Sequence, residues 1–252
     1  MPPFPLPWRL LPDAEGDPAW NMALDETLLE SHRLGLTPPT LRFYSWAPPA
    51  LSLGYAQPLE DVDLEACAAA GIAVVRRSTG GRAVLHRGEF TYAVIASEGF
   101  PPSVAGTYRL ITEVLAEAIA RLGAPADIAP GKLGRAGSAS CFQSATQADL
   151  VTLGRKLVGS AQTRREGAFL QHGSLMLSQR PDEIRPLLRR AAPGGDATCL
   201  EDVLGRAPAR EAIAEAIVQA VASTWGVRLD IGALTPWEVD RARSRMAAHR
   251  LA

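Results

Sequence analysis

Three segments in the middle of the chain have strand character and follow one another with only short turns between them. The segments are Asp149–Leu153, Lys156–Thr163 and Ala168–Leu177. Gly154-Arg155 suits the two-residue turn of a hairpin, because glycine tolerates the positive φ that tight hairpins need. Strands joined in this way pair antiparallel, which indicates an α+β domain rather than a doubly wound parallel sheet.

The rest of the chain supplies shorter strands and amphipathic helices. Helices are predicted from Asp17-Pro18 to about Gly35 and from Ser103 to Leu122, where apolar residues recur at helical spacing. Other strands are expected at Thr40–Trp46, Ala50–Gly54, Ala73–Arg77, Arg82–His86 and Phe90–Ala96, and other helices at Leu64–Ala70, Asp182–Arg190, Ala207–Trp225 and Pro236–His249. We expect one domain over residues 1–252, with a core over about 8–180 and a helical C-terminal extension over about 181–252.

Composition excludes several classes of protein. With 47% apolar and 21% charged residues in 252, the chain is neither disordered nor fibrous, and its net charge of −1 argues against a surface built for nucleic acid. No apolar run approaches the roughly 20 residues of a membrane helix. The first seven residues include four prolines and lack the basic flank and apolar stretch of a secretory signal. We therefore expect a cytoplasmic protein with no nucleic-acid or membrane partner.

A glycine pair flanked by arginines lies between two predicted strands, in the segment from Arg76 to His86. Gly80 and Gly81 let the backbone approach a ligand closely, and their N–H groups can hold an anion or a carbonyl oxygen. The spacing matches neither a dinucleotide-binding GxGxxG motif nor a phosphate-binding P-loop. The alternative interpretation is a basic hairpin turn without a ligand.

One of the three cysteines lies in surroundings that favour reactivity. Cys67 is expected in the core and Cys199 has no basic neighbour in sequence, whereas Cys141 lies in a small, polar, Ser/Gly-rich stretch. The window from Arg121 to Arg165 holds seven basic and two acidic residues, and positive surroundings lower the pKa of a thiol. Cys141 is therefore a candidate nucleophile, with an incidental thiol as the alternative. No cysteine spacing fits a metal site.

Lysine usage directs attention to a second residue. Of the 26 basic residues only two are lysines, Lys132 and Lys156. Arginine replaces lysine where a solvated charge is enough, but not where a compact, deprotonatable amine is needed. Lys156 lies beside the predicted hairpin turn and is followed by small residues that leave room for a ligand. The alternative is a solvated lysine on an exposed strand, and His86 and His172 are likewise more often structural hydrogen-bonding residues than bases.

Taken in order, these motifs resemble the lipoate/biotin protein ligase superfamily. The resemblance runs from about Trp8 to Leu177 and is carried by segments 21–26, 76–86, 89–92, 154–162 and 170–174. It implies a curved, mixed or antiparallel sheet flanked by helices. Two chemistries occur in this superfamily: ATP-dependent lipoate ligases, and octanoyltransferases that carry the acyl group on their own cysteine.

The chain is more similar to the cysteine-dependent octanoyltransferases that load the glycine cleavage H protein. This resemblance implies acyl carrier protein as donor, a lysine of the H protein or another lipoyl domain as acceptor, and no cofactor. It assigns Cys141 as nucleophile and Lys156 as its supporting amine. The open alternatives are an ATP- and Mg²⁺-dependent lipoate or octanoate ligase, a lipoyl amidotransferase, and a binding module without catalysis.

The resemblance also assigns a set of substrate-binding residues, among which backbone N–H groups near Gly80-Gly81 or Gly159 are candidates to hold the thioester oxygen. The set is Arg77, Ser78, Thr79, Gly80, Gly81, Arg82, His86, Gly159, Ser160, Ala161, His172 and Gly173.

Overall fold

The structure is a computed structural model of the whole chain. It describes residues 4, 7–97, 99–129, 149–178, 180–190 and 197–252. In this part of the chain no helix combines the length and the apolarity needed to cross a membrane.

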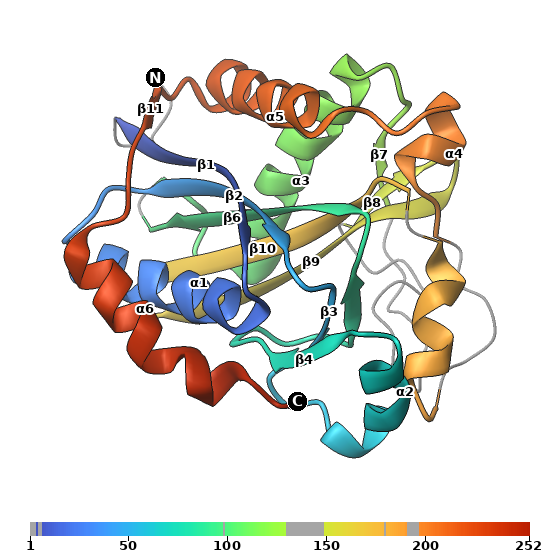
Figure 1. Cartoon of the computed structure of the whole chain (residues 1–252). Coiled ribbons are helices and arrows are strands. Elements are labelled where there is room, and N and C mark those ends of the chain that lie inside the picture. Colours follow the sequence, from blue (N-terminus) through green and yellow to red (C-terminus); the bar gives the residue numbers. More distant parts are fainter. Residues whose placement is uncertain (1–3, 5–6, 98, 130–148, 179, 191–196) are drawn as a thin grey trace.

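An eight-stranded mixed sheet runs through the centre of the molecule (Figure 1). Its strands, in spatial order, are β11 (Leu229–Ile231), β1 (Trp8–Gly16), β2 (Thr40–Trp46), β6 (Glu89–Ala96), β10 (Ala168–Met176), β9 (Arg155–Arg165), β8 (Leu150–Thr152) and β7 (Asp127–Ile128). The pairs β11–β1 and β1–β2 are parallel, and the pairs from β2 to β7 are antiparallel. The predicted α+β class with a mixed sheet is confirmed.

Helices cover both faces of this sheet. On one face lie α3 (Val104–Arg121) and α5 (Arg210–Trp225), and on the other lie α1 (Pro18–Arg33) and α6 (Pro236–His249) (Figure 1). Because both faces are covered, β6 and β10 are buried at every position. Asp17 caps α1 by accepting hydrogen bonds from the backbone N–H groups of Ala19 and Trp20.

A three-stranded sheet lies beside the main one and carries the glycine pair. Its order is β4 (Ala73–Arg76), β3 (Ala50–Leu53) and β5 (Val84–His86), with Gly80-Gly81 in the connection from β4 to β5. The short helices α2 (Leu64–Ala69) and α4 (Leu200–Leu204) and two 3₁₀ helices, η1 (Leu59–Asp61) and η3 (Pro181–Leu187), complete the described elements.

The predicted hairpins are confirmed, with one change of turn. Thr152 pairs with Arg155, so the turn consists of Leu153 and Gly154, with φ values of 50° and 75°, and not of Gly154-Arg155. Both central residues of a type I′ turn have positive φ, and glycine supplies one of them without strain.

The structure adds three details that the sequence did not indicate. Residues 8–16 form β1. The helix expected over 182–190 is a 3₁₀ helix over 181–187, with Pro186 inside it. Within the mostly helical segment after residue 180, the short strand β11 pairs with β1.

Candidate active site

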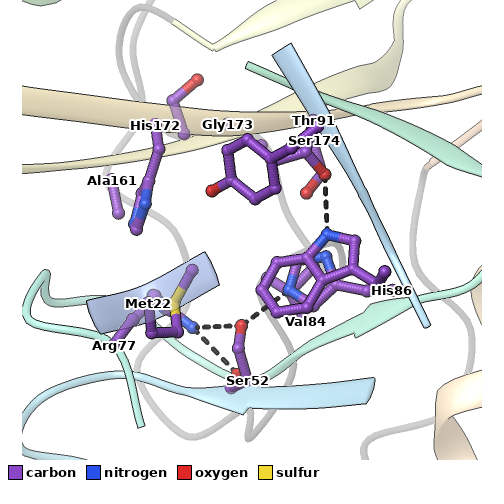
Figure 2. Close-up of a pocket in the computed structure, with 14 residues that line it drawn as sticks. Met22, Ser52, Arg77, Val84, His86, Thr91, Ala161, His172, Gly173 and Ser174 are labelled. Carbon is purple, nitrogen blue, oxygen red and sulfur yellow. Dashed lines mark hydrogen bonds between the residues drawn. The ribbon is translucent and has the colours of Figure 1, made fainter. Parts of the chain in front are cut away.

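A cavity that is partly open to solvent lies where the three-stranded sheet meets the main sheet (Figure 2). Side chains from α1, from strands of both sheets and from the end of β4 surround it, and its apolar walls come mainly from Met22, Tyr44, Trp46 and Val84. The full set of lining residues is Met22, Tyr44, Trp46, Ser52, Arg77, Val84, His86, Thr91, Gly159, Ser160, Ala161, His172, Gly173 and Ser174. A few convergent polar groups among apolar walls are typical of a small-molecule site.

Seven of the predicted substrate-binding residues line this cavity, although they come from four separate segments of the chain. They are Arg77, His86, Gly159, Ser160, Ala161, His172 and Gly173. Gly80, Gly81 and Arg82 are exposed, Ser78 is half-buried, and Thr79 is buried behind His172; these five do not line the cavity.

The guanidinium of Arg77 holds the glycine turn in place. Its Nε and Nη2 atoms donate to the carbonyl of Gly80 at 3.2 and 2.8 Å, and Nη2 also donates to the carbonyl of Arg82 at 2.8 Å. Its Nη1 donates to the backbone oxygen of Ser52 on β3 at 2.9 Å. The buried charge of Arg77 therefore braces the turn against β3.

Gly173 provides space for a hydrogen bond that crosses β10. It pairs with Tyr92 of β6 on one side and with Ser160 of β9 on the other. The hydroxyl groups of Tyr92 and Ser160 lie 2.7 Å apart, and a Cβ on Gly173 would come within 2.6 Å of the Ser160 Oγ. Only glycine leaves room for this contact, which explains the residue at this position.

A buried chain of polar groups links α1 to the glycine turn through His172. The Nδ1 of His172 lies 2.8 Å from the Asp25 carboxylate, and its Nε2 lies 2.7 Å from the hydroxyl of Thr79. Burial favours a raised pKa for Asp25, but the charge of Arg42 and hydrogen bonds from His172 and Tyr44 outweigh it and lower the pKa. Ionised Asp25 therefore accepts a hydrogen bond from His172 Nδ1–H, and His172 Nε2 accepts a hydrogen bond from the hydroxyl of Thr79.

A second chain of the same kind reaches the cavity through His86. Its Nδ1 lies 3.2 Å from Glu89 Oε1, and its Nε2 lies 2.8 Å from Ser52 Oγ. The indole of Trp46 stacks on the imidazole with ring centroids 3.8 Å apart. Burial, partly opposed by Glu89, lowers the pKa of His86. Ser52 and Glu89 were not predicted as site residues, since the strand pattern does not show which side chains two separate sheets bring together.

The Lys156 side chain is buried beside a carboxylate. Its ammonium Nζ lies 2.8 Å from Asp149 Oδ2, and both side chains are 2% exposed. The alternative of a solvated lysine is therefore wrong. Lys156 precedes the cavity-lining Gly159 by three strand positions, or roughly 10 Å along β9. Cys141, the predicted nucleophile, lies outside the described residues.

The two cysteines in the described part of the chain are not candidates for nucleophilic chemistry. Cys67 and Cys199 are buried and free. Burial, with a contribution from Asp63, raises the pKa of Cys67 to about 11, and burial also raises the pKa of Cys199. Both thiols are therefore protonated at neutral pH, as the sequence analysis expected for residues without a reactive role.

The arrangement of the two sheets, with the cavity between them and the buried lysine on β9, is that of the lipoyl protein ligase class. The family described as Lipoyl protein ligase A/B catalytic domain matches residues 17–222, and the chain belongs to this family. It is 42% identical to the octanoyltransferase LipM of Moorella thermoacetica, covering 97% of this chain and 96% of that protein. It is 43% identical to the octanoyltransferase LipM of Kyrpidia tusciae, with 96% of each covered. The chain is an enzyme of the acyltransferase class.

Solved structures share the fold over nearly the whole chain. A crystal structure of lipoate-protein ligase A bound with ATP matches with a TM-score of 0.83 at 24% identity, covering 96% of this chain and 95% of that one. A putative lipoate protein ligase from T. acidophilum with bound lipoic acid matches with a TM-score of 0.82 at 25% identity, covering 96% of each chain. The family and the fold expected from the sequence motifs are thus confirmed.

Proposed function

We propose that the enzyme transfers an octanoyl group from acyl carrier protein to a lysine of a lipoyl-acceptor protein, with the glycine cleavage H protein as the expected acceptor. The observation that carries this proposal is the cavity with Met22, Tyr44, Trp46 and Val84 in its apolar walls. An unbranched acyl chain in such a cavity gains roughly 0.8 kcal/mol per buried CH₂ group. The similarity to octanoyltransferases over the full length supports the same acyl group.

The proposed reaction has two steps and needs no cofactor. The Cys141 thiolate attacks the carbonyl of the donor thioester, and the carrier thiolate leaves and takes up a proton. The acceptor amine then attacks the new Cys141 thioester, forms an amide and releases the Cys141 thiol. Exchange between thioesters is nearly neutral in free energy and amide formation from a thioester is favourable, so neither step requires ATP.

Lys156 is proposed to make the Cys141 thiolate available. An ammonium group close to a thiol stabilises the thiolate, at about 1.4 kcal/mol for each unit by which the thiol pKa falls. The carboxylate Oδ2 of Asp149 lies 2.8 Å from Nζ and holds the amine in place. Lys156 also has a proton to exchange when the acceptor amine attacks, which the guanidinium of an arginine does not.

Two exposed arginines support an acidic carrier domain as donor. Arg82 at the glycine turn and Arg155 at the start of β9 are both exposed. Exposed positive charge accelerates encounter with acidic partners. We propose the same surface for the acceptor domain, which has to present its lysine to the same acyl group.

Intact-mass analysis after mixing with octanoyl carrier protein tests the proposal. We expect a hydroxylamine-labile octanoyl adduct on Cys141 that forms equally well with and without ATP. Transfer at the wild-type rate by the Cys141→Ser variant would overturn the thioester route. Activation of free octanoate or lipoate that requires ATP and survives Cys141→Ala would instead indicate a ligase.

A second assay separates transfer from carrier protein from transfer between lipoyl domains. Lipoylated H protein is mixed with an unmodified lipoyl domain and the enzyme. Under the proposal, octanoyl carrier protein is the faster donor by at least about tenfold. Faster transfer from lipoylated H protein would identify an amidotransferase.

A further inference from the structure

Two carboxylate–imidazole–hydroxyl chains meet at the cavity, and they differ in where the hydroxyl lies. In the chain Asp25–His172–Thr79 the hydroxyl belongs to a fully buried residue that does not line the cavity. In the chain Glu89–His86–Ser52 the hydroxyl belongs to a cavity-lining residue (Figure 2). Only Ser52 is therefore placed to contact a molecule bound in the cavity.

The hydrogen bonds around His86 define its tautomer. Glu89 accepts from Nδ1–H at 3.2 Å, so Nε2 carries the lone pair and Ser52 donates its hydroxyl hydrogen to it at 2.8 Å. Burial lowers the pKa of His86, which keeps the imidazole neutral and able to accept a proton. This is the order of groups that activates a serine hydroxyl in hydrolases of several unrelated folds.

Neighbouring groups fix this chain on both sides. Trp46 stacks on the His86 ring with an interplanar angle of 15° and donates through Nε1 to Thr91 Oγ1 at 2.9 Å. Thr91 in turn donates to Glu89 Oε1 at 3.2 Å. Arg77 Nη1 donates to Ser52 Oγ at 3.2 Å, which places a positive charge beside the oxygen (Figure 2).

We propose that Ser52, with His86 as general base and Glu89 as its orienting carboxylate, is a second acyl-accepting nucleophile that hydrolyses medium-chain acyl esters and thioesters bound in the cavity. This activity goes beyond the proposed octanoyl transfer and does not involve Cys141. Its substrate class follows from the apolar walls, which suit an unbranched acyl chain whose carbonyl lies at Ser52.

The steps balance with water as the only co-reactant. Ser52 Oγ attacks the acyl carbonyl while its proton moves to His86 Nε2, and the oxyanion forms beside the Arg77 guanidinium. The thiolate or alkoxide leaves and receives that proton, which gives an ester of Ser52. Water then attacks this ester, transfers one proton through His86 back to Ser52 Oγ, and releases the fatty acid.

The test uses the full-length Cys141→Ala enzyme and p-nitrophenyl octanoate, so neither a carrier protein nor the thioester route is required. We expect measurable hydrolysis that falls at least about 100-fold on adding Ser52→Ala or His86→Asn, the usual scale for losing a nucleophile or a general base. The matched control is Ser31→Ala, which removes a buried hydroxyl bonded to Thr37 at 3.1 Å, away from the cavity. Hydrolysis unaffected by Ser52→Ala would overturn the proposal.

A covalent readout separates catalysis from a structural role of Ser52. A fluorophosphonate probe on the Cys141→Ala enzyme is expected to label the peptide that contains Ser52, and prior incubation with octanoate should slow the labelling. A serine that merely braces Arg77 would remain unlabelled, and this result overturns the proposal even where Ser52→Ala fails to fold. Failure of the octanoyl-transfer assay would leave both readouts unchanged, so the two proposals are tested separately.

Discussion

The ammonium Nζ of Lys156 lies 2.8 Å from the carboxylate Oδ2 of Asp149, and each side chain is 2% exposed. Because both side chains are shielded from water, each charge is stabilised mainly by the other, since an unpaired buried ion is strongly disfavoured. The pair joins β9 to the residue directly before β8, so it contributes to the packing of the sheet.

Replacing Lys156 by arginine is expected to slow octanoyl transfer by at least about 100-fold while the far-ultraviolet circular dichroism stays unchanged. Arginine keeps the positive charge but does not release a proton, and its planar fork does not fit a site formed around a compact amine. Transfer is followed by mass spectrometry of the acceptor. Arg228→Lys, the reverse change at an exposed arginine that pairs with Asp230 at 3.0 Å, should keep the rate within about threefold. A Lys156→Arg enzyme with normal kinetics would remove this lysine from the mechanism.

Replacing Asp149 by asparagine is expected to lower the free energy of unfolding by about 3 kcal/mol, since it removes one charge of a buried pair. Urea denaturation at pH 7 measures this change. Asp182→Asn provides a comparison, because that carboxylate pairs with Arg185 at 3.8 Å with its side chain 67% exposed and should contribute less than about 0.5 kcal/mol. Equal effects of the two substitutions would contradict the assignment of Lys156 and Asp149 as a buried ion pair.

The central strands could be predicted from the sequence because their signals are local. Apolar residues concentrate on either side of Gly154 and after Gly167, and both glycines have positive φ in the hairpin turns. Strand β1 escaped prediction because Pro12 interrupts it, a register shift lies between Leu11 and Ala14, and its partners β2 and β11 are distant in the chain. Pairing between distant segments leaves no local pattern to detect.

The residues of the candidate site likewise include some that the sequence indicates and others that only the tertiary structure reveals. Gly173 and His172 were found because they lie in motifs, whereas Ser52 and Trp46 lie on ordinary apolar strands and become site residues only when the two sheets meet. The sequence also does not indicate that Arg77 is occupied with the carbonyls of its own turn. The family resemblance assigned Arg77 to substrate binding, and the tertiary structure adds the bracing role.

Replacing Gly54 by alanine should destabilise the protein, whereas replacing Gly80 by alanine should leave its stability almost unchanged. A Cβ on Gly54 would lie 2.1 Å from the carbonyl oxygen of Gly81, and backbone atoms cannot yield there without moving the whole turn. Gly54→Ala is therefore expected to lower the free energy of unfolding by about 1–3 kcal/mol and to reduce octanoyl transfer. A Cβ on Gly80 meets nothing within 4 Å, so Gly80→Ala should change stability by less than about 0.5 kcal/mol. Denaturant titration of both variants checks the contrast, and similar losses in the two would disprove the close approach.

The ionised state of Asp25 should make its contribution to stability depend on pH. Burial favours a raised pKa, but Arg42, His172 and Tyr44 together lower the pKa of this carboxyl in the folded protein. A group whose pKa is lowered on folding stabilises the protein fully above its unfolded pKa of about 3.9, and this stabilisation is lost as the pH falls through that value toward the folded pKa. Asp25→Asn should therefore cost about 3–5 kcal/mol at pH 7, because Arg42 loses its buried countercharge.

The difference between wild type and Asp25→Asn should shrink below about pH 4, since protonation of Asp25 in the unfolded wild type then stabilises its unfolded state. Measuring the free energy of unfolding of both proteins from pH 3 to pH 7 gives this difference directly. Glu26, Glu30 and Glu238 also have lowered pKa values, but they are present in both proteins and largely cancel in the comparison. A difference that stays constant across this range would mean that Asp25 does not carry its negative charge in the folded enzyme, and the tautomer assigned to His172 would then have to be reversed.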